Sequence, residues 1–65
     1  MKGFQVFIQT PPGSALAWDW VGQPLDGLYS AQLLAFFAAQ FYGRGTVVQD
    51  LATGKFVASY AKVLA

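Results

Sequence analysis

The sequence predicts an α+β fold of two layers, in which a four-stranded antiparallel sheet carries one helix on one face. Three observations predict it. Two stretches of alternating residues near the N-terminus flank a turn rich in proline and glycine, two more near the C-terminus flank a turn containing glycine, and a long uncharged stretch lies between the pairs. The 65 residues form one domain, 1–65, and 55% of them are hydrophobic, enough for a core. The expected element order is ββαββ.

The first two strands are expected to form a hairpin. Residues 2–10 alternate between two faces, and residues 11–14, with two prolines and a glycine, end that strand. A second strand is expected over 15–21. Its tryptophans, Trp18 and Trp20, lie two residues apart and therefore share one face, which we expect to pack under the helix.

The helix is expected between Ser30, as the N-cap residue, and Gly43, as a left-handed residue just past the end. At 100° per residue, the residues expected to face the sheet are Leu33, Leu34, Phe37, Ala38 and Phe41. We expect two of them, Phe37 and Phe41, to be core residues. Their expected contacts are Phe4, Val6, Ile8 and Trp18.

The third and fourth strands are expected over 46–51 and 55–63, joined by the short turn 52–55. A right-handed crossover through the helix leaves a gap between the second and third strands, which the first strand fills. The predicted strand order is 2-1-3-4, with every neighbouring pair antiparallel.

The residue inventory argues against catalysis. The chain contains no His, no Cys and no Glu, so no side chain titrates near neutral pH without an unusual shift, and we expect no catalytic residue, metal site or cofactor. Four cations and three aspartates give a net charge of +1, which does not favour direct nucleic-acid binding. The longest weakly polar stretch, 28–42, is too short for a membrane span.

A protein-binding surface is expected on the outer face of the helix, because that face lacks charge. Its expected residues are Gln32, Ala35, Phe36, Ala39 and Tyr42. With the residues that extend it, the candidate partner contacts are Asp19, Asp26, Tyr29, Gln32, Phe36 and Tyr42. An ordinary solvated face, self-association of a structural phage or host protein through this face, and weak nucleic-acid binding through Arg44, Lys55 and Lys62 stay open as alternatives.

The size and layout of the whole chain resemble one class of small phage and mobile-element proteins. The resemblance runs from Lys2-Gly-Phe-Gln-Val-Phe-Ile through Gly45-Thr-Val-Val-Gln-Asp to Lys55-Phe-Val-Ala-Ser-Tyr. In this respect the chain is similar to the anti-CRISPR proteins of Pseudomonas-type elements. The resemblance implies an inhibitor in the cytoplasm of a bacterial host that docks on a DNA-recognising subunit of a type I effector complex (Cascade) and blocks target DNA binding. We expect it to act as a monomer, without a membrane or a small-molecule substrate.

Overall fold

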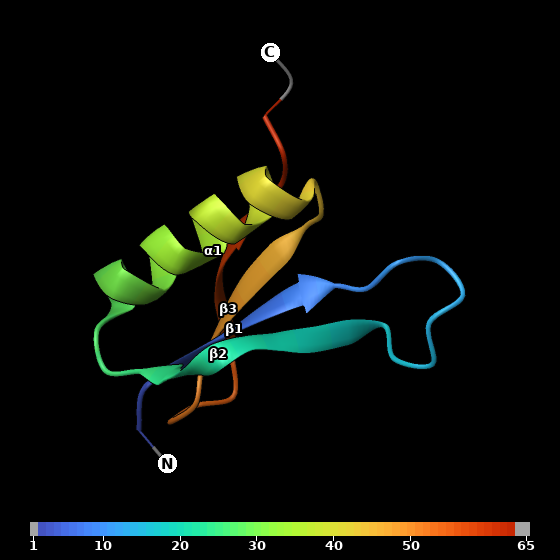
Figure 1. The fold of residues 1–65 in the computed structure, drawn as a ribbon. Coiled ribbons are helices and arrows are strands. Elements are labelled where there is room, and N and C mark those ends of the chain that lie inside the picture. The colour runs from blue at the N-terminus through green and yellow to red at the C-terminus, as the bar shows by residue number, and fades with distance from the viewer. Residues whose placement is uncertain (1, 64–65) are drawn as a thin grey trace.

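The computed structural model describes residues 2–63 and has two layers, with one helix lying across one face of a four-stranded sheet (Figure 1). The elements are β1 (Phe4–Gln9), β2 (Trp18–Leu25), α1 (Leu28–Tyr42), β3 (Thr46–Asp50) and β4 (Phe56–Tyr60). The sheet order is β2-β1-β3-β4 and all neighbouring strands are antiparallel. The predicted fold class and strand order are therefore confirmed.

The connection between β1 and β2 is longer than the sequence indicates, and Figure 1 shows it extending beyond the end of the sheet. The backbone amide of Thr10 donates to the carbonyl of Ala17 at 3.0 Å, which closes the loop one residue before β2. The second strand then continues to Leu25, although Gly22 and Pro24 indicated a connector. Strand pairing with β1, from Gln9 opposite Trp18 to Phe4 opposite Leu25, overrides these two residues. The expected boundaries 15–21 are wrong.

Only the C-terminal end of α1 agrees with the prediction. Gly43 has φ 69° and ψ 31°, and its amide donates to the carbonyl of Ala39 at 2.9 Å, so the left-handed end is confirmed. The other end begins earlier than predicted. Gly27 occupies the N-cap position, its carbonyl accepts from the amide of Ala31, and Ser30 lies inside the helix.

The underside of α1 is lined mainly by alanines, and Leu34 packs beside them against the core. The expected inward positions of Leu34 and Ala38 are therefore confirmed, whereas those of Leu33, Phe37 and Phe41 are wrong. Four alanines are buried. They are Ala31, Ala35, Ala38 and Ala39. Ala31 and Ala35 pack against Val6 and Val48, which are at most 1% exposed. Small side chains allow the helix axis to lie close to branched valines, and this close packing leaves no room for a ring. Phe37 and Phe41 instead point outward, with 62% and 81% of their surface exposed.

The strand register also corrects the expected position of the tryptophans. Gln9 lies opposite Trp18 and Phe7 lies opposite Trp20, so both indoles are on the face of the sheet that the helix does not cover. Asp19, between them, is on the helix side, opposite Ile8. Trp18 is therefore not a core residue under α1.

Candidate functional site

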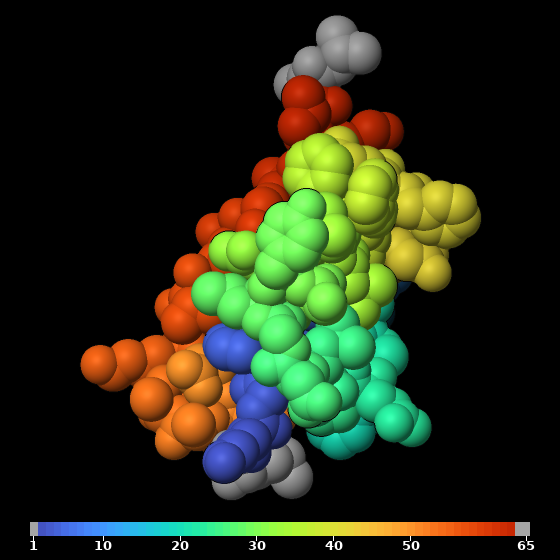
Figure 2. Space-filling model, turned by 90° about the vertical axis from the view of Figure 1, so that its left-hand side faces the viewer, coloured from blue at the N-terminus to red at the C-terminus, as the bar shows by residue number. Residues whose placement is uncertain are grey.

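The outward side of α1 forms a continuous apolar surface, which we call the helix surface. It consists of Tyr29, Leu33, Phe36, Phe37 and Phe41, all of them exposed. The whole of α1 contains no charged residue. Figure 2 shows α1, in green to yellow, as a ridge between the orange-red atoms of β4 and the teal atoms of β2. Exposed apolar surface of this extent on a small domain indicates a binding site.

Edge-to-face contacts hold several of these rings in place. The centroids of Phe36 and Phe37 lie 5.6 Å apart with an interplanar angle of 73°, and Phe36 also meets Tyr60 of β4 at 6.1 Å and 84°. At the end of the helix, Phe41 and Tyr42 lie 4.8 Å apart at 89°. Such contacts are favourable for aromatic pairs. They restrict the rings before any partner arrives, which lowers the ordering cost of binding.

Three of the six predicted contact residues lie together on or beside the helix surface. Tyr29 and Phe36 belong to it, and the half-buried Gln32 lies on its β4 flank beside Phe36. Asp26 is exposed just before the first turn of α1. One partner on the helix surface can contact these four predicted residues.

Of the other two predicted residues, Tyr42 borders the helix surface, because its ring lies 4.8 Å from that of Phe41, whereas Asp19 on β2 lies apart from it. Both residues line a shallow hollow on the β2 side, together with Arg44 at the end of the helix. A carboxylate oxygen of Asp19 accepts from the backbone amide of Trp20 at 2.8 Å. This hollow is therefore a second, more polar location, and Tyr42 lies between it and the helix surface.

Sequence reasoning missed three residues of the helix surface, Leu33, Phe37 and Phe41, because it assigned large apolar side chains to the core. The available signal was the spacing of the alanines. Ala31, Ala35, Ala38 and Ala39 follow the i, i+4, i+7, i+8 pattern of one buried helix face. A buried face made of alanine forces the large residues outward.

A second apolar surface covers the opposite side of the molecule; we call it the sheet surface. It consists of Phe7, Trp18, Trp20, Val47 and Phe56. Four of these residues, all but Trp20, line an apolar hollow of about 430 Å³. The remaining side chains that the strands place on this face are uncharged. The buried Gln5 among them is satisfied, since its amide donates to the carbonyls of Val6 at 3.0 Å and Gly22 at 3.2 Å.

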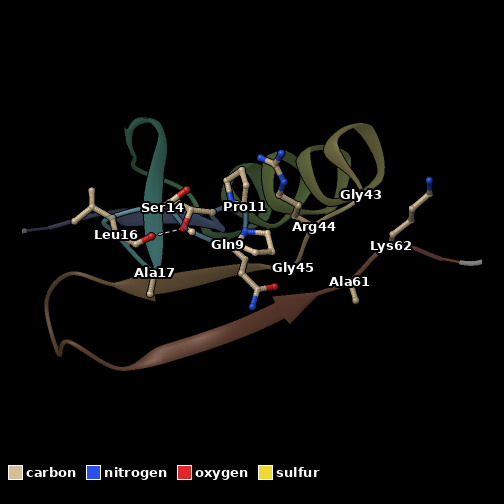
Figure 3. Close-up of a pocket in the computed structure, with 13 residues that line it drawn as sticks. Gln9, Pro11, Ser14, Leu16, Ala17, Gly43, Arg44, Gly45, Ala61 and Lys62 are labelled. Carbon is tan, nitrogen blue, oxygen red and sulfur yellow. Dashed lines mark hydrogen bonds between the residues drawn. The ribbon is translucent and has the colours of Figure 1, made fainter.

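A third hollow lies where the β1–β2 loop approaches the end of α1 (Figure 3). Two cations line it, and Figure 3 shows that the side chains of Arg44 and Lys62 point away from one another. The carbonyl end of α1, at Gly43, carries the negative end of the helix dipole there. This arrangement does not form a site for an anion.

Within residues 2–63, no three side chains of the His, Cys, Asp or Glu type are grouped as metal ligands would be. No helix in the same range has the length and apolar character needed to cross a membrane. Comparison with models of protein families, with curated proteins and with solved structures gave no match. The two apolar surfaces are therefore the features of the described residues that bear on function.

Proposed function

We propose that this protein is a non-enzymatic binding protein that docks on another protein through the helix surface. The observation that carries the proposal is a row of exposed, uncharged rings above an alanine underside that fixes which side of α1 points outward. Interface centres favour aromatic residues and exclude charge. The helix surface has this composition.

The exposed area is large enough to support association. Covering Tyr29, Phe37 and Phe41 removes roughly 400 Å² from water, given the usual area of an aromatic side chain. At about 25 cal/mol per Å², this burial is worth roughly 10 kcal/mol before costs. Association costs on the order of 4–15 kcal/mol. The rings alone therefore offset most of that cost, and contacts at the rim contribute the rest.

The chemistry of the surface indicates the kind of partner. A neutral aromatic ridge fits an apolar groove, and Asp26 beside the first turn of α1 favours a basic residue at the edge of that groove. The resemblance to anti-CRISPR proteins suggests a specific partner, a DNA-recognising subunit of a type I effector complex in the bacterial cytoplasm. Docking there would block target DNA by occupying the surface that DNA needs.

The same proposal assigns no reaction to the chain. Its acidic side chains are three aspartates: Asp19 on β2, Asp26 between β2 and α1, and Asp50 on β3. General acid–base work needs positioned groups that exchange protons near the working pH, and His, Cys and Glu do not occur in the sequence. Inhibition by occupancy requires none of these groups.

The test compares two variants, each of which introduces one positive charge on one of the two broad faces of the molecule. Phe37→Lys alters the helix surface, and Phe56→Lys makes the same change at an exposed ring of the sheet surface. Binding to a purified type I effector complex, and DNA binding by that complex, are measured with both folded variants. We expect Phe37→Lys to weaken binding about 30-fold or more, as at an interface hot spot, and Phe56→Lys to leave it unchanged.

Normal binding by a folded Phe37→Lys variant would overturn the use of the helix surface. If the unaltered protein does not bind the effector complex, the anti-CRISPR form of the proposal fails. Self-association through the helix surface, the alternative, is recognised by a loss of oligomers in Phe37→Lys without any effector present.

A further inference from the structure

We propose that the sheet surface is the interface of a symmetric homodimer, so that a second copy of this chain covers it. This inference concerns the side of the molecule opposite the helix surface and does not depend on the proposed function. It departs from the expectation of a monomer. A separate expectation placed Trp18 and Trp20 under the helix, whereas the strand register puts both on the uncovered face.

The sheet surface lacks charged side chains, which favours a second copy of the chain as its partner. In a two-fold interface every residue meets the same surface patch of its partner, so a charged patch would face its own sign and repel. The strands place Phe7, Trp20, Val47 and Phe56 on this face, with uncharged glutamines between them. Two copies can therefore approach without like-charge repulsion.

The shape of the sheet surface is also compatible with a two-fold contact, because it has both a projecting ring and a hollow. Trp20 is 72% exposed and stands beside Phe7, its partner across the β1–β2 ladder. The hollow next to it is lined by apolar side chains, and Trp18 and Phe56 form two of its walls. A two-fold axis lying between the ring and the hollow brings the Trp20 ring of each copy into the hollow of the other. One surface thus supplies both the projecting group and its receptor.

The exposed apolar area of the sheet surface is close to what a small dimer interface requires. Trp18, Trp20 and Phe56 are 41%, 72% and 64% exposed, and full coverage removes roughly 400 Å² per copy. Together with the polar side chains between them, two copies approach the total of about 1,000 Å² expected of a specific interface. Two sheets packed face to face at the usual separation of about 10 Å achieve this coverage. An interface of this size lies at the lower end of the range for specific interfaces, where weak and transient association is usual.

The chain carries its own probe for this interface. It contains two tryptophans, and both lie on the sheet surface. Sedimentation and tryptophan emission are measured on the full chain over a dilution series from about 1 μM to about 1 mM. We expect the mass to rise from monomer to dimer, and the emission to shift to shorter wavelength over the same concentration range.

Two variants test the position of the contact. Trp20→Lys places a charge at the centre of the proposed interface, and we expect it to weaken the dimer about 30-fold or more. Phe37→Lys is the matched control on the opposite face, and we expect it to leave the dimer unchanged. Far-UV circular dichroism establishes that each variant is folded, and Phe56→Lys replaces Trp20→Lys if the latter does not fold.

Three outcomes would overturn the inference. The first is a monomer throughout the dilution series. The second is a dimer that Phe37→Lys abolishes and Trp20→Lys does not, because the contact is then on the helix. The third is a monomer whose tryptophan emission is quenched by single-stranded oligothymidine in a salt-dependent way, which would assign the rings to stacked bases. None of these measurements involves the effector complex, so this proposal and the proposed function can fail separately.

Discussion

The hydroxyl of Thr46 donates a 2.7 Å hydrogen bond to the backbone carbonyl of Ala35, and both residues are buried. This bond joins the first residue of β3 to the middle of α1. It ties the helix to the sheet with Ala35 facing inward, in agreement with the packing of the alanines against Val6 and Val48. The rings of Phe37 and Phe41 are exposed in this orientation of the helix.

Replacing Thr46 with valine removes the hydroxyl and keeps the shape of the side chain. We expect a loss of about 1 kcal/mol in the free energy of unfolding, the usual net worth of such a bond, because the helix itself still satisfies the Ala35 carbonyl. In a domain of this size the melting temperature falls by roughly 4–8 °C. Thr46→Ser is the control that keeps the donor. A Thr46→Val variant as stable as the unaltered protein would show that the bond is not formed.

We expect Ala35→Leu to destabilise the protein more than Phe37→Ala does. This order reverses the usual rule that removing a ring costs the most stability. Ala35 is fully buried, so the larger side chain must displace α1 from the sheet, at a cost of about 1–3 kcal/mol or more. Phe37 is exposed and contacts one neighbouring ring, so its truncation costs no more than about 1 kcal/mol. Denaturant unfolding measures both. A loss of about 3–5 kcal/mol in Phe37→Ala, typical of a core ring, would mean that the helix is rotated.

The two glycines that flank α1 should respond differently to a side chain. Gly43 is left-handed, so Gly43→Ala costs about 1–2 kcal/mol, even though the added carbon would meet Lys62 only at the ordinary distance of 3.5 Å. Gly27 has φ −102° and no side-chain cap, so Gly27→Ser supplies one and gains a few tenths of a kcal/mol. Thermal melts of the two variants should move in opposite directions. A shift of the same sign in both would contradict the assigned ends of the helix.

The amide of Gln40 ties the segment after β4 to the helix, since it donates to the carbonyl of Ala61 at 3.1 Å and accepts from the amide of Val63 at 3.0 Å. Gln40→Leu removes both bonds, whereas Gln40→Glu keeps the acceptor. We expect hydrogen exchange at Val63 to accelerate in Gln40→Leu and to change little in Gln40→Glu. Because both bonds are exposed, global stability should fall by about 1 kcal/mol or less. Equal hydrogen exchange at Val63 in the two variants would show that the Gln40 side chain does not hold this segment.

The sequence predicted the elements and their order because turn residues and alternating runs are local signals. Gly43 ends the helix as expected, and the order 2-1-3-4 follows from the crossover rule. The boundaries of β2 were harder to predict, because pairing with β1 extends this strand through Gly22 and Pro24. A local reading favours turns at those two positions, and only the register with a strand elsewhere in the chain decides against it.

The candidate site was predicted in its apolar character and in part of its residues, since Tyr29 and Phe36 lie on the helix surface, whereas Leu33, Phe37 and Phe41 were assigned to the core. The segment that forms α1 has apolar residues on every side, so two rotations of the helix bury a plausible stripe. The choice depends on fit against Val6 and Val48, which the alanines satisfy and the phenylalanines do not. The same uncertainty applies to Trp18 and Trp20, since their alternation shows that they share a face without showing which one.

The position of large rings on both broad sides of a body about 17 Å thick has a consequence for the amount of this protein in a cell. A copy without its companions presents the kind of apolar surface that chaperones and proteases use to recognise incompletely folded chains. Copies whose helix and sheet surfaces are covered as proposed would not be recognised in this way. Steady-state abundance should therefore follow the supply of binding sites more closely than the rate of synthesis, and unassembled copies should be short-lived.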